Sequence, residues 1–192
     1  MIENLFKESL RLAGLLRHQY PKSLGIKMSN WEDIFIYLNK PIPKIFRVIY
    51  SNVSGTERDI EEQELMDFCP GYRLIHISEL IEESNKLRNI LIDEKLYDNE
   101  VVIPILGNYS SDYICYYKNN DGEEMICSLR NDSGELIVIH SAPEKFLETV
   151  CEFYKQGVYF LDSDGYLDYD MEKECLVGSL INHGITYWNE EA

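Results

Sequence analysis

Four short runs of strand-forming residues lie close together between Val101 and His140, and clusters of turn-forming residues separate them. The runs read VVIPIL, DYICYY, EMICSL and ELIVIH, and the segments between them read GNYSS, KNNDGE and RNDSG. β-Branched and aromatic residues favour strands, whereas Gly, Asn, Asp and Ser favour the turns that reverse the chain. Because connections this short join neighbouring antiparallel strands, the region predicts an antiparallel meander sheet.

Helical periodicity dominates on either side of this sheet. Near the N-terminus, apolar residues recur every three or four positions within IENLFKESLRLAGLL, which predicts an amphipathic helix. After the sheet, Ser141 and Glu144 have the spacing of a capping box and predict the start of another helix. A short hairpin, VYFL-DSDG-YLDY, follows, and Asp170 is the predicted cap of a final helix.

Runs of helices and runs of strands that are kept apart along a chain indicate an α+β fold. We expect an antiparallel meander sheet with helices packed against one face, an N-terminal helical extension and a C-terminal hairpin plus helix. The corresponding division of the chain is an extension at residues 1–29, an α+β domain at residues 30–185 and a tail at residues 186–192. A chain of 192 residues can bury a core of this kind without disulfide bonds.

The segment Asn120-Asp121-Gly122 predicts a tight hairpin between the second and third runs. Side chains alternate between the two faces of a strand, so one face of this hairpin is apolar and should pack beneath the helices. That face carries Tyr113, Cys115, Tyr117, Met125, Cys127 and Leu129. The other face carries Asp112, Ile114, Tyr116, Ile126, Ser128 and Arg130. Its mixed character suits a surface that is wet in the free protein and covered in a complex, although the N-terminal helices could cover it as well.

The chain is strongly acidic: 34 Asp and Glu residues against 18 Lys and Arg residues give a formal net charge of −16. This charge argues against direct binding of nucleic acid or anionic membranes and would speed encounters with basic partners. The alternative is that the charge only maintains solubility. The five cysteines are widely spaced and contain no C-x-x-C pair, which favours free thiols in a reducing compartment. Since no signal peptide or membrane-spanning run is present in the sequence, we expect a cytoplasmic protein.

Motifs that usually carry chemistry are missing from this sequence. It contains neither a phosphate-binding glycine loop nor a G-x-S-x-G elbow, and its four histidines do not have the spacing of metal ligands. The acidic segment DSDGYLDYDMEKE resembles a calcium loop, but Tyr166, Leu167 and Lys173 occupy the fifth, sixth and twelfth positions from Asp162. An EF-hand needs an oxygen ligand, Gly and Glu there, and a hairpin turn explains the segment better. We therefore predict no enzymatic activity, no metal and no cofactor.

Several segments combine in an order that resembles a known family. Ile42-Pro43 leads into a helix with Phe46 and Ile49, and GYRLIHISELIEE follows at residues 71–83. VIPIL and DYICYY then form paired strands, IHSAPEKFLETV forms a strand and helix, and GVYFLDSDGYLDYD comes last. This order resembles the SUKH superfamily, which includes yeast cell-wall-assembly regulators and many bacterial immunity proteins. The sequence departs from the family pattern at SNVSGT, where a Gly-rich bend is expected, and at Ser110-Ser111, where Gly is expected.

The resemblance implies a protein that binds and inhibits a partner. Bacterial members commonly neutralise a cognate polymorphic toxin, often a nuclease, and nucleases are usually basic because they must grip phosphates. An acidic inhibitor can be steered electrostatically to such a target. The first hypothesis is therefore an immunity protein, and the alternative is a regulatory adaptor that binds an endogenous cytoplasmic protein. The candidate partner-contact residues are Tyr109, Asp112, Tyr116, Glu123, Asp162 and Asp164.

Overall fold

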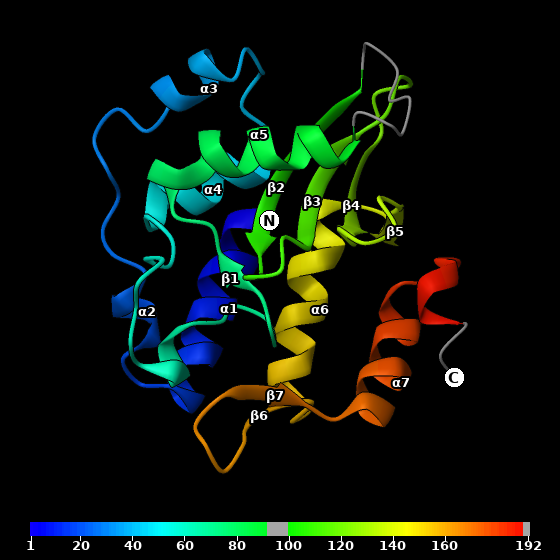
Figure 1. Cartoon of the computed structure of the whole chain (residues 1–192). Coiled ribbons are helices and arrows are strands. Elements are labelled where there is room, and N and C mark those ends of the chain that lie inside the picture. The colour runs from blue at the N-terminus through cyan, green and yellow to red at the C-terminus, as the bar shows by residue number, and fades with distance from the viewer. Residues whose placement is uncertain (92–99, 190–192) are drawn as a thin grey trace.

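Five antiparallel strands, taken in chain order, form the main sheet of the protein (Figure 1). The computed structural model describes residues 1–91 and 100–189. The sheet contains β1 (Arg73–Leu74), β2 (Val101–Gly107), β3 (Tyr113–Lys118), β4 (Glu124–Leu129) and β5 (Leu136–His140). Each strand pairs with its neighbours in sequence, so the predicted meander is confirmed. A separate hairpin, also as predicted, consists of β6 (Tyr159–Leu161) and β7 (Leu167–Tyr169).

Helices precede and follow the sheet, which confirms the α+β class. The α-helices are α1 (Ile2–Leu16), α2 (Tyr20–Ser23), α3 (Asp33–Tyr37), α4 (Lys44–Asn52), α5 (Leu80–Leu91), α6 (Pro143–Lys155) and α7 (Met171–Ile181). Single turns of 3-10 helix are η1 (Gln63–Leu65), η2 (Ile77–Glu79) and η3 (Thr186–Trp188). Within the described parts of the chain, none of these helices has the length and apolar character required to cross a bilayer.

Turn chemistry and proline explain the register of the central strands. Strands β3 and β4 pair without interruption from Tyr113 opposite Leu129 onward, and Gly122 in the connecting turn has a φ of 86°. Only glycine adopts such a φ without strain, as the predicted hairpin requires. Strand β1 reaches only the end of β2, and the register of β2 against β3 shifts just after Pro104. The missing N–H of proline therefore falls where one side of β2 has no strand partner among the described residues.

Packed side chains lie on both faces of the β3–β4 hairpin; we expected helices against one face and left open whether the N-terminal helices cover the other. On the face expected to be wet, Tyr116 is 2% exposed and its ring packs edge-on against Phe46 of α4, with 6.1 Å between centroids. On the other face, the buried Tyr113 donates a hydrogen bond from its hydroxyl to Glu83 of α5 at 2.7 Å. The prediction that the face carrying Tyr116 is a free contact surface is therefore wrong at this residue. The alternative prediction, that an N-terminal helix covers this face, is confirmed at Tyr116.

One hydrophobic core extends from Ile2 to Trp188, so the two ends of the chain belong to the same packed body. Helix α1 lies along α6 and buries Phe6 and Ala13 (Figure 1). At the other end, Thr186–Trp188 forms η3 and the Trp188 ring packs against Phe153 of α6 at 6.0 Å. Residues 186–188, which we assigned to a tail, are therefore part of the domain.

Two predicted helix caps have opposite outcomes. Asp170 caps α7, because its side chain accepts a hydrogen bond from the Lys173 N–H at 3.1 Å. The predicted capping box at Ser141 is wrong, since α6 begins at Pro143 and Ala142 is the N-cap residue without a side-chain hydrogen bond. Proline suits the first position of a helix, where an N–H has no intrahelical partner, so Pro143 sets this start.

Candidate functional site

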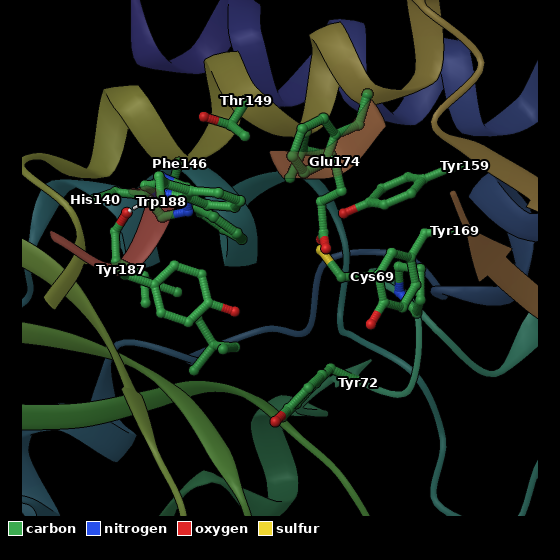
Figure 2. A pocket seen from close by; sticks show the side chains of 15 residues that line it. Cys69, Tyr72, His140, Phe146, Thr149, Tyr159, Tyr169, Glu174, Tyr187 and Trp188 are labelled. Carbon is green, nitrogen blue, oxygen red and sulfur yellow. Dashed lines mark hydrogen bonds between the residues drawn. The ribbon is translucent and has the colours of Figure 1, made fainter. Parts of the chain in front are cut away.

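A cavity of about 150 Å³ lies where α6, the main sheet, the β6–β7 hairpin and the C-terminal helices meet (Figure 2). Its buried inner part is lined by apolar side chains and by three buried polar ones: Ile114, Ile139, Phe146, Val150, Phe153 and Trp188, with His140, Thr149 and Tyr159. Its outer part is half-buried or exposed and carries further polar groups, namely Cys69, Tyr72, Tyr169, Glu174 and Tyr187. The cavity is therefore open at a polar rim and closed at an apolar base.

Helix spacing and strand pairing bring these side chains together. In α6, Phe146, Thr149, Val150 and Phe153 follow the i, i+3, i+4, i+7 pattern of one helix face, and all four line the cavity. In the hairpin, Tyr159 and Tyr169 are directly opposite one another in register, so their side chains lie on the same face. Figure 2 shows the Tyr159 hydroxyl and the Glu174 carboxylate near the Cys69 sulfur, and the Tyr187 hydroxyl pointing into the cavity.

Trp188 forms the base of the cavity because a glycine on α7 leaves room for its ring. A Cβ at Gly178 would lie 2.2 Å from Cε3 of Trp188, which is closer than two carbon atoms can approach. The indole Nε1 of Trp188 donates a hydrogen bond to the Ile139 carbonyl at 2.6 Å. Its ring also packs against His140, with 5.6 Å between centroids. The indole is thereby fixed to both the sheet and α7.

His140 is part of a buried polar network beside this base. Its Nδ1 lies 2.8 Å from Oδ1 of Asn182, whose Nδ2 donates to Oγ1 of Thr149 and to the Gly178 carbonyl, each at 3.0 Å. Those two acceptors fix the orientation of the amide, so Nδ1 of His140 carries the proton. Burial lowers the pKa of His140 to about 4, and the hydrogen bond to Asn182 offsets this only in part. The imidazole is therefore neutral near pH 7 and adds no positive charge to the cavity.

The Cys69 thiol and the Tyr159 phenol of the cavity are held in their protonated forms. Removal from water raises the pKa of Cys69 to about 12, and it also raises the pKa of Tyr159 well above its usual range. The Glu174 carboxylate acts in the same direction on both groups. A thiol with so high a pKa is a poor nucleophile at neutral pH. The arrangement is thus suited to holding a ligand by its rings and oxygens.

Within residues 1–91 and 100–189, no three His, Cys, Asp or Glu side chains are grouped so that they could hold a metal ion.

The six predicted contact residues do not form a single site. Tyr116 is buried and donates from its hydroxyl to Glu124 at 2.8 Å, so it cannot contact a partner without rearrangement. Tyr109 and Asp112 lie in the turn before β3, whereas Glu123 lies in the turn after it. The length of β3, six residues at about 3.3 Å each, separates these two ends by roughly 20 Å.

Asp162 and Asp164 are in a third place, the β6–β7 turn (Figure 1). Asp162 accepts hydrogen bonds from the N–H groups of Asp164 and Tyr166, each at 2.9 Å. This is the turn role that the sequence predicted for the segment. Asp164 is exposed at the tip of the hairpin. Contact of either residue with a partner stays a prediction.

Sequence reasoning missed the cavity itself. Its lining comes from five separated parts of the chain, from Cys69 to Trp188, and no local motif joins them. The signal that could have drawn attention to it is the density of aromatic residues after Phe146, where tyrosines occur on α6, on both hairpin strands and on η3.

Exposed apolar side chains are concentrated beside the cavity, on the hairpin and α7. We call residues 160–180 the C-terminal surface. Its large exposed residues are Phe160, Tyr166, Tyr169, Met171, Leu176 and Leu180, and they are between 37% and 63% exposed. The same segment contains six Asp and Glu residues and a single lysine. It therefore combines apolar area with negative charge.

Neither a comparison with models of protein families nor one with curated protein sequences finds a match to this chain, so the resemblance to the SUKH superfamily stays a prediction.

Proposed function

We propose that this protein is an immunity protein, which neutralises a basic toxin domain, such as a nuclease, by binding it. The observation that carries the proposal is the C-terminal surface. There Leu176 and Leu180 lie one helical turn apart on α7 and are 63% and 60% exposed. Apolar side chains of this kind supply binding energy when a partner covers them, and the surrounding carboxylates steer a basic partner to them.

The charge of the whole chain supports the same kind of partner. A net charge of −16 attracts a basic domain over a longer range than any single contact, and this attraction weakens as salt screens it. Within the cavity, the neutral His140 and the protonated Cys69 favour binding over chemistry. An inhibitor needs only a complementary surface, so this combination is sufficient for the proposed role.

Co-expression tests the proposal directly. Cells would produce the full chain together with the toxin domain encoded beside its gene, and their survival would be compared with that of cells producing the toxin domain alone. Protection and a co-purifying complex are expected. If the toxin domain kills both kinds of cell equally, or if no toxin gene lies beside this one, the immunity function is wrong.

A matched pair of variants locates the interface. Leu176→Asp should weaken the complex at least tenfold, because it places a charge within the covered apolar area. Leu15→Asp changes a leucine of α1 that is 74% exposed and should change affinity less than twofold. Circular dichroism of both variants checks the fold. Equal effects of the two substitutions would place the interface elsewhere.

A further inference from the structure

We propose that two copies of this protein associate through a groove beside α3 to form a two-fold dimer. The groove has a volume of about 410 Å³ and is lined by residues between Glu32 and Ile42. Figure 1 shows α3 and α7 at opposite ends of the molecule, so the groove lies away from the C-terminal surface. The inference therefore goes beyond the proposed function and does not depend on it.

The turn at the end of α3 shapes the groove. Asn39 has a φ of 52°, and the Lys40 N–H donates a hydrogen bond to the Phe35 carbonyl at 3.2 Å. This is the left-handed turn with which Gly or Asn commonly ends a helix. After it, Pro41 and Ile42 line the same groove as the helix. The helix and the returning chain therefore form its two walls.

The base and one wall of the groove are rigid. Phe35 lines the base and is 1% exposed. Its ring packs edge-on against Trp31 and Phe46, with 6.1 and 5.4 Å between centroids. Pro41 and Pro43 restrict the backbone of the returning chain. A surface that is already fixed loses little conformational entropy when a partner covers it.

Two apolar side chains of α3 extend into solvent at the groove. Ile36 lines it and is 75% exposed, and the neighbouring Tyr37 is 79% exposed. Covering these side chains removes apolar area from water, which stabilises a complex. A small molecule would stay largely hydrated beside so exposed a wall, whereas a binding pocket buries most of its ligand. A protein surface with an apolar side chain that protrudes fits the groove better.

The charges of the groove complement those of a second copy. Glu32 and Lys40 both line it, and neither forms an ion pair with another residue that the structure describes. In a two-fold dimer the same surface of each copy meets the other, so a contact between two different residues occurs twice. Glu32 of each protomer then pairs with Lys40 of its partner. The exposed Ile36 side chains supply the apolar part of the same contact.

The distribution of charge along the chain favours self-association at this end. Residues 18–56 contain five of the 18 Lys and Arg residues but only two of the 34 Asp and Glu residues. Two copies that met at the C-terminal surface would bring many carboxylates together, and these repel one another. Contact at α3 places the two acidic surfaces at the far ends of the dimer, where screening by salt weakens their repulsion (Figure 1).

Other partners fit this surface less well. The lysines of residues 18–56 would attract an anionic bilayer, but Glu32 and the exposed Asp33 at the start of α3 would repel it. A basic domain would meet more cations than carboxylates in this segment. A second copy pairs charges of both signs.

Sedimentation velocity of the full chain tests the dimer. The average mass should rise from that of a monomer to that of a dimer as the concentration increases. Because one groove is a small interface, the expected dissociation constant is on the order of 10–100 μM. A chain that stays monomeric at concentrations about tenfold above this range would overturn the proposal.

A matched pair of isoleucine variants locates the contact. Ile36→Asp places a charge in the contact twice and should weaken the dimer at least tenfold. Ile26→Asp makes the same change at a residue that is 87% exposed and outside the groove, and it should change the dissociation constant less than twofold. Circular dichroism checks the fold of both variants. Equal effects of the two substitutions would place any dimer contact elsewhere and refute the groove.

Variants with exchanged charges test the two-fold geometry. Glu32→Lys and Lys40→Glu should each weaken self-association about tenfold, because each places like charges opposite one another at two contacts. An equimolar mixture of the two variants should associate as strongly as the unaltered chain, since both contacts of the mixed dimer join opposite charges. A mixture that associates as weakly as its components would refute the pairing of Glu32 with Lys40.

Vesicles distinguish a second copy from a lipid surface. The chain should stay in the supernatant when vesicles of phosphatidylserine and phosphatidylcholine are sedimented. If it pellets with them and Ile36→Asp abolishes the pelleting, the groove binds lipid and the assignment to a second copy is wrong. These measurements contain no toxin, so protection without a dimer would overturn this inference alone, and a dimer without protection would overturn the proposed function alone.

Discussion

Two places in the described parts of this protein combine tyrosine rings with oxygen acceptors, and they differ in how far they are closed to solvent. The first is the site of Arg17, which is 1% exposed and donates from Nη1 to the carbonyls of Glu64 and Asp67 at 3.1 and 2.6 Å. The second is the aromatic cavity, whose polar rim at Glu174 and Tyr169 is open to solvent.

The difference separates a structural role from a binding role. Arg17 joins α1 to the η1–β1 loop and to α6 through Tyr154, so its site holds together elements that are far apart in sequence. A buried cation is costly to dehydrate, and three acceptors and the Tyr20 ring offset that cost, although the Nε of Arg17 has no hydrogen-bond partner among the described residues. The cavity also has tyrosine rings and a carboxylate, but part of its lining is exposed.

We expect the largest effect on stability from removing the guanidinium group of Arg17. Arg17→Met should lower the free energy of unfolding by about 3–5 kcal/mol, because two buried carbonyls and the Tyr154 hydroxyl lose their donor. Urea denaturation at pH 7 measures this. Arg11→Met, at an exposed position of α1, is the control and should leave the free energy of unfolding nearly unchanged. A loss below about 1 kcal/mol at Arg17 would end the distinction between a structural site and a binding site.

A smaller effect should come from His140 beside the cavity base. Its pKa is about 4 in the folded state and about 6.5 when unfolded, so only the unfolded chain gains a proton as the pH falls between these values. The contribution of neutral His140 to the free energy of unfolding is therefore complete above about pH 6.5. It decreases on acidification, by about 2 kcal/mol at pH 5.

The variant His140→Gln isolates this contribution. The difference in unfolding free energy between pH 7 and pH 5 should be about 2 kcal/mol smaller in the variant than in the unaltered protein. Urea denaturation at the two pH values measures both. Parallel pH profiles would show that His140 is less buried than the packing against Trp188 indicates.

The smallest effects distinguish two hydroxyls of the Arg17 site. Tyr154→Phe removes the acceptor of a 2.6 Å hydrogen bond from Arg17 and should cost about 1–2 kcal/mol. Tyr20→Phe should be neutral or stabilising by up to about 1 kcal/mol, since the buried Tyr20 hydroxyl has no hydrogen-bond partner in the described parts of the chain. Urea denaturation of both variants measures the two changes in the free energy of unfolding. Equal losses would mean that the ring of Tyr20 is less important than its hydroxyl.

Local features of the fold could be predicted where local physics sets them. The hairpin turns at Gly122 and Gly165 need a positive φ, and the Asp170 cap needs only the next turn of its own helix. The capping box at Ser141 failed because Pro143 competed for the same helix start. Alternation assigned Tyr116 to the correct strand face, but it gave no information on which helix would cover that face.

The candidate site could not be predicted from the sequence for the same reason. Tyr72, Tyr169 and Tyr187 belong to three segments whose spacing along the chain follows no period. Whether they come together depends on how α6 and α7 pack. Part of that packing is set by Gly178, because the Trp188 ring occupies the space that a Cβ at this position would need. A pattern search along one strand or helix cannot detect such a contact.

By itself, the sequence determined the α+β class, the order of the strands, the two hairpins and the acidic character of the surface. Each of these follows from residues within a few positions of one another or from a simple sum of charges. Only the tertiary structure decided that Tyr116 is buried, that Arg17 is enclosed and that the cavity exists. Those outcomes depend on contacts between distant segments, whose free energies are set by how completely each polar group finds a partner when the helices pack.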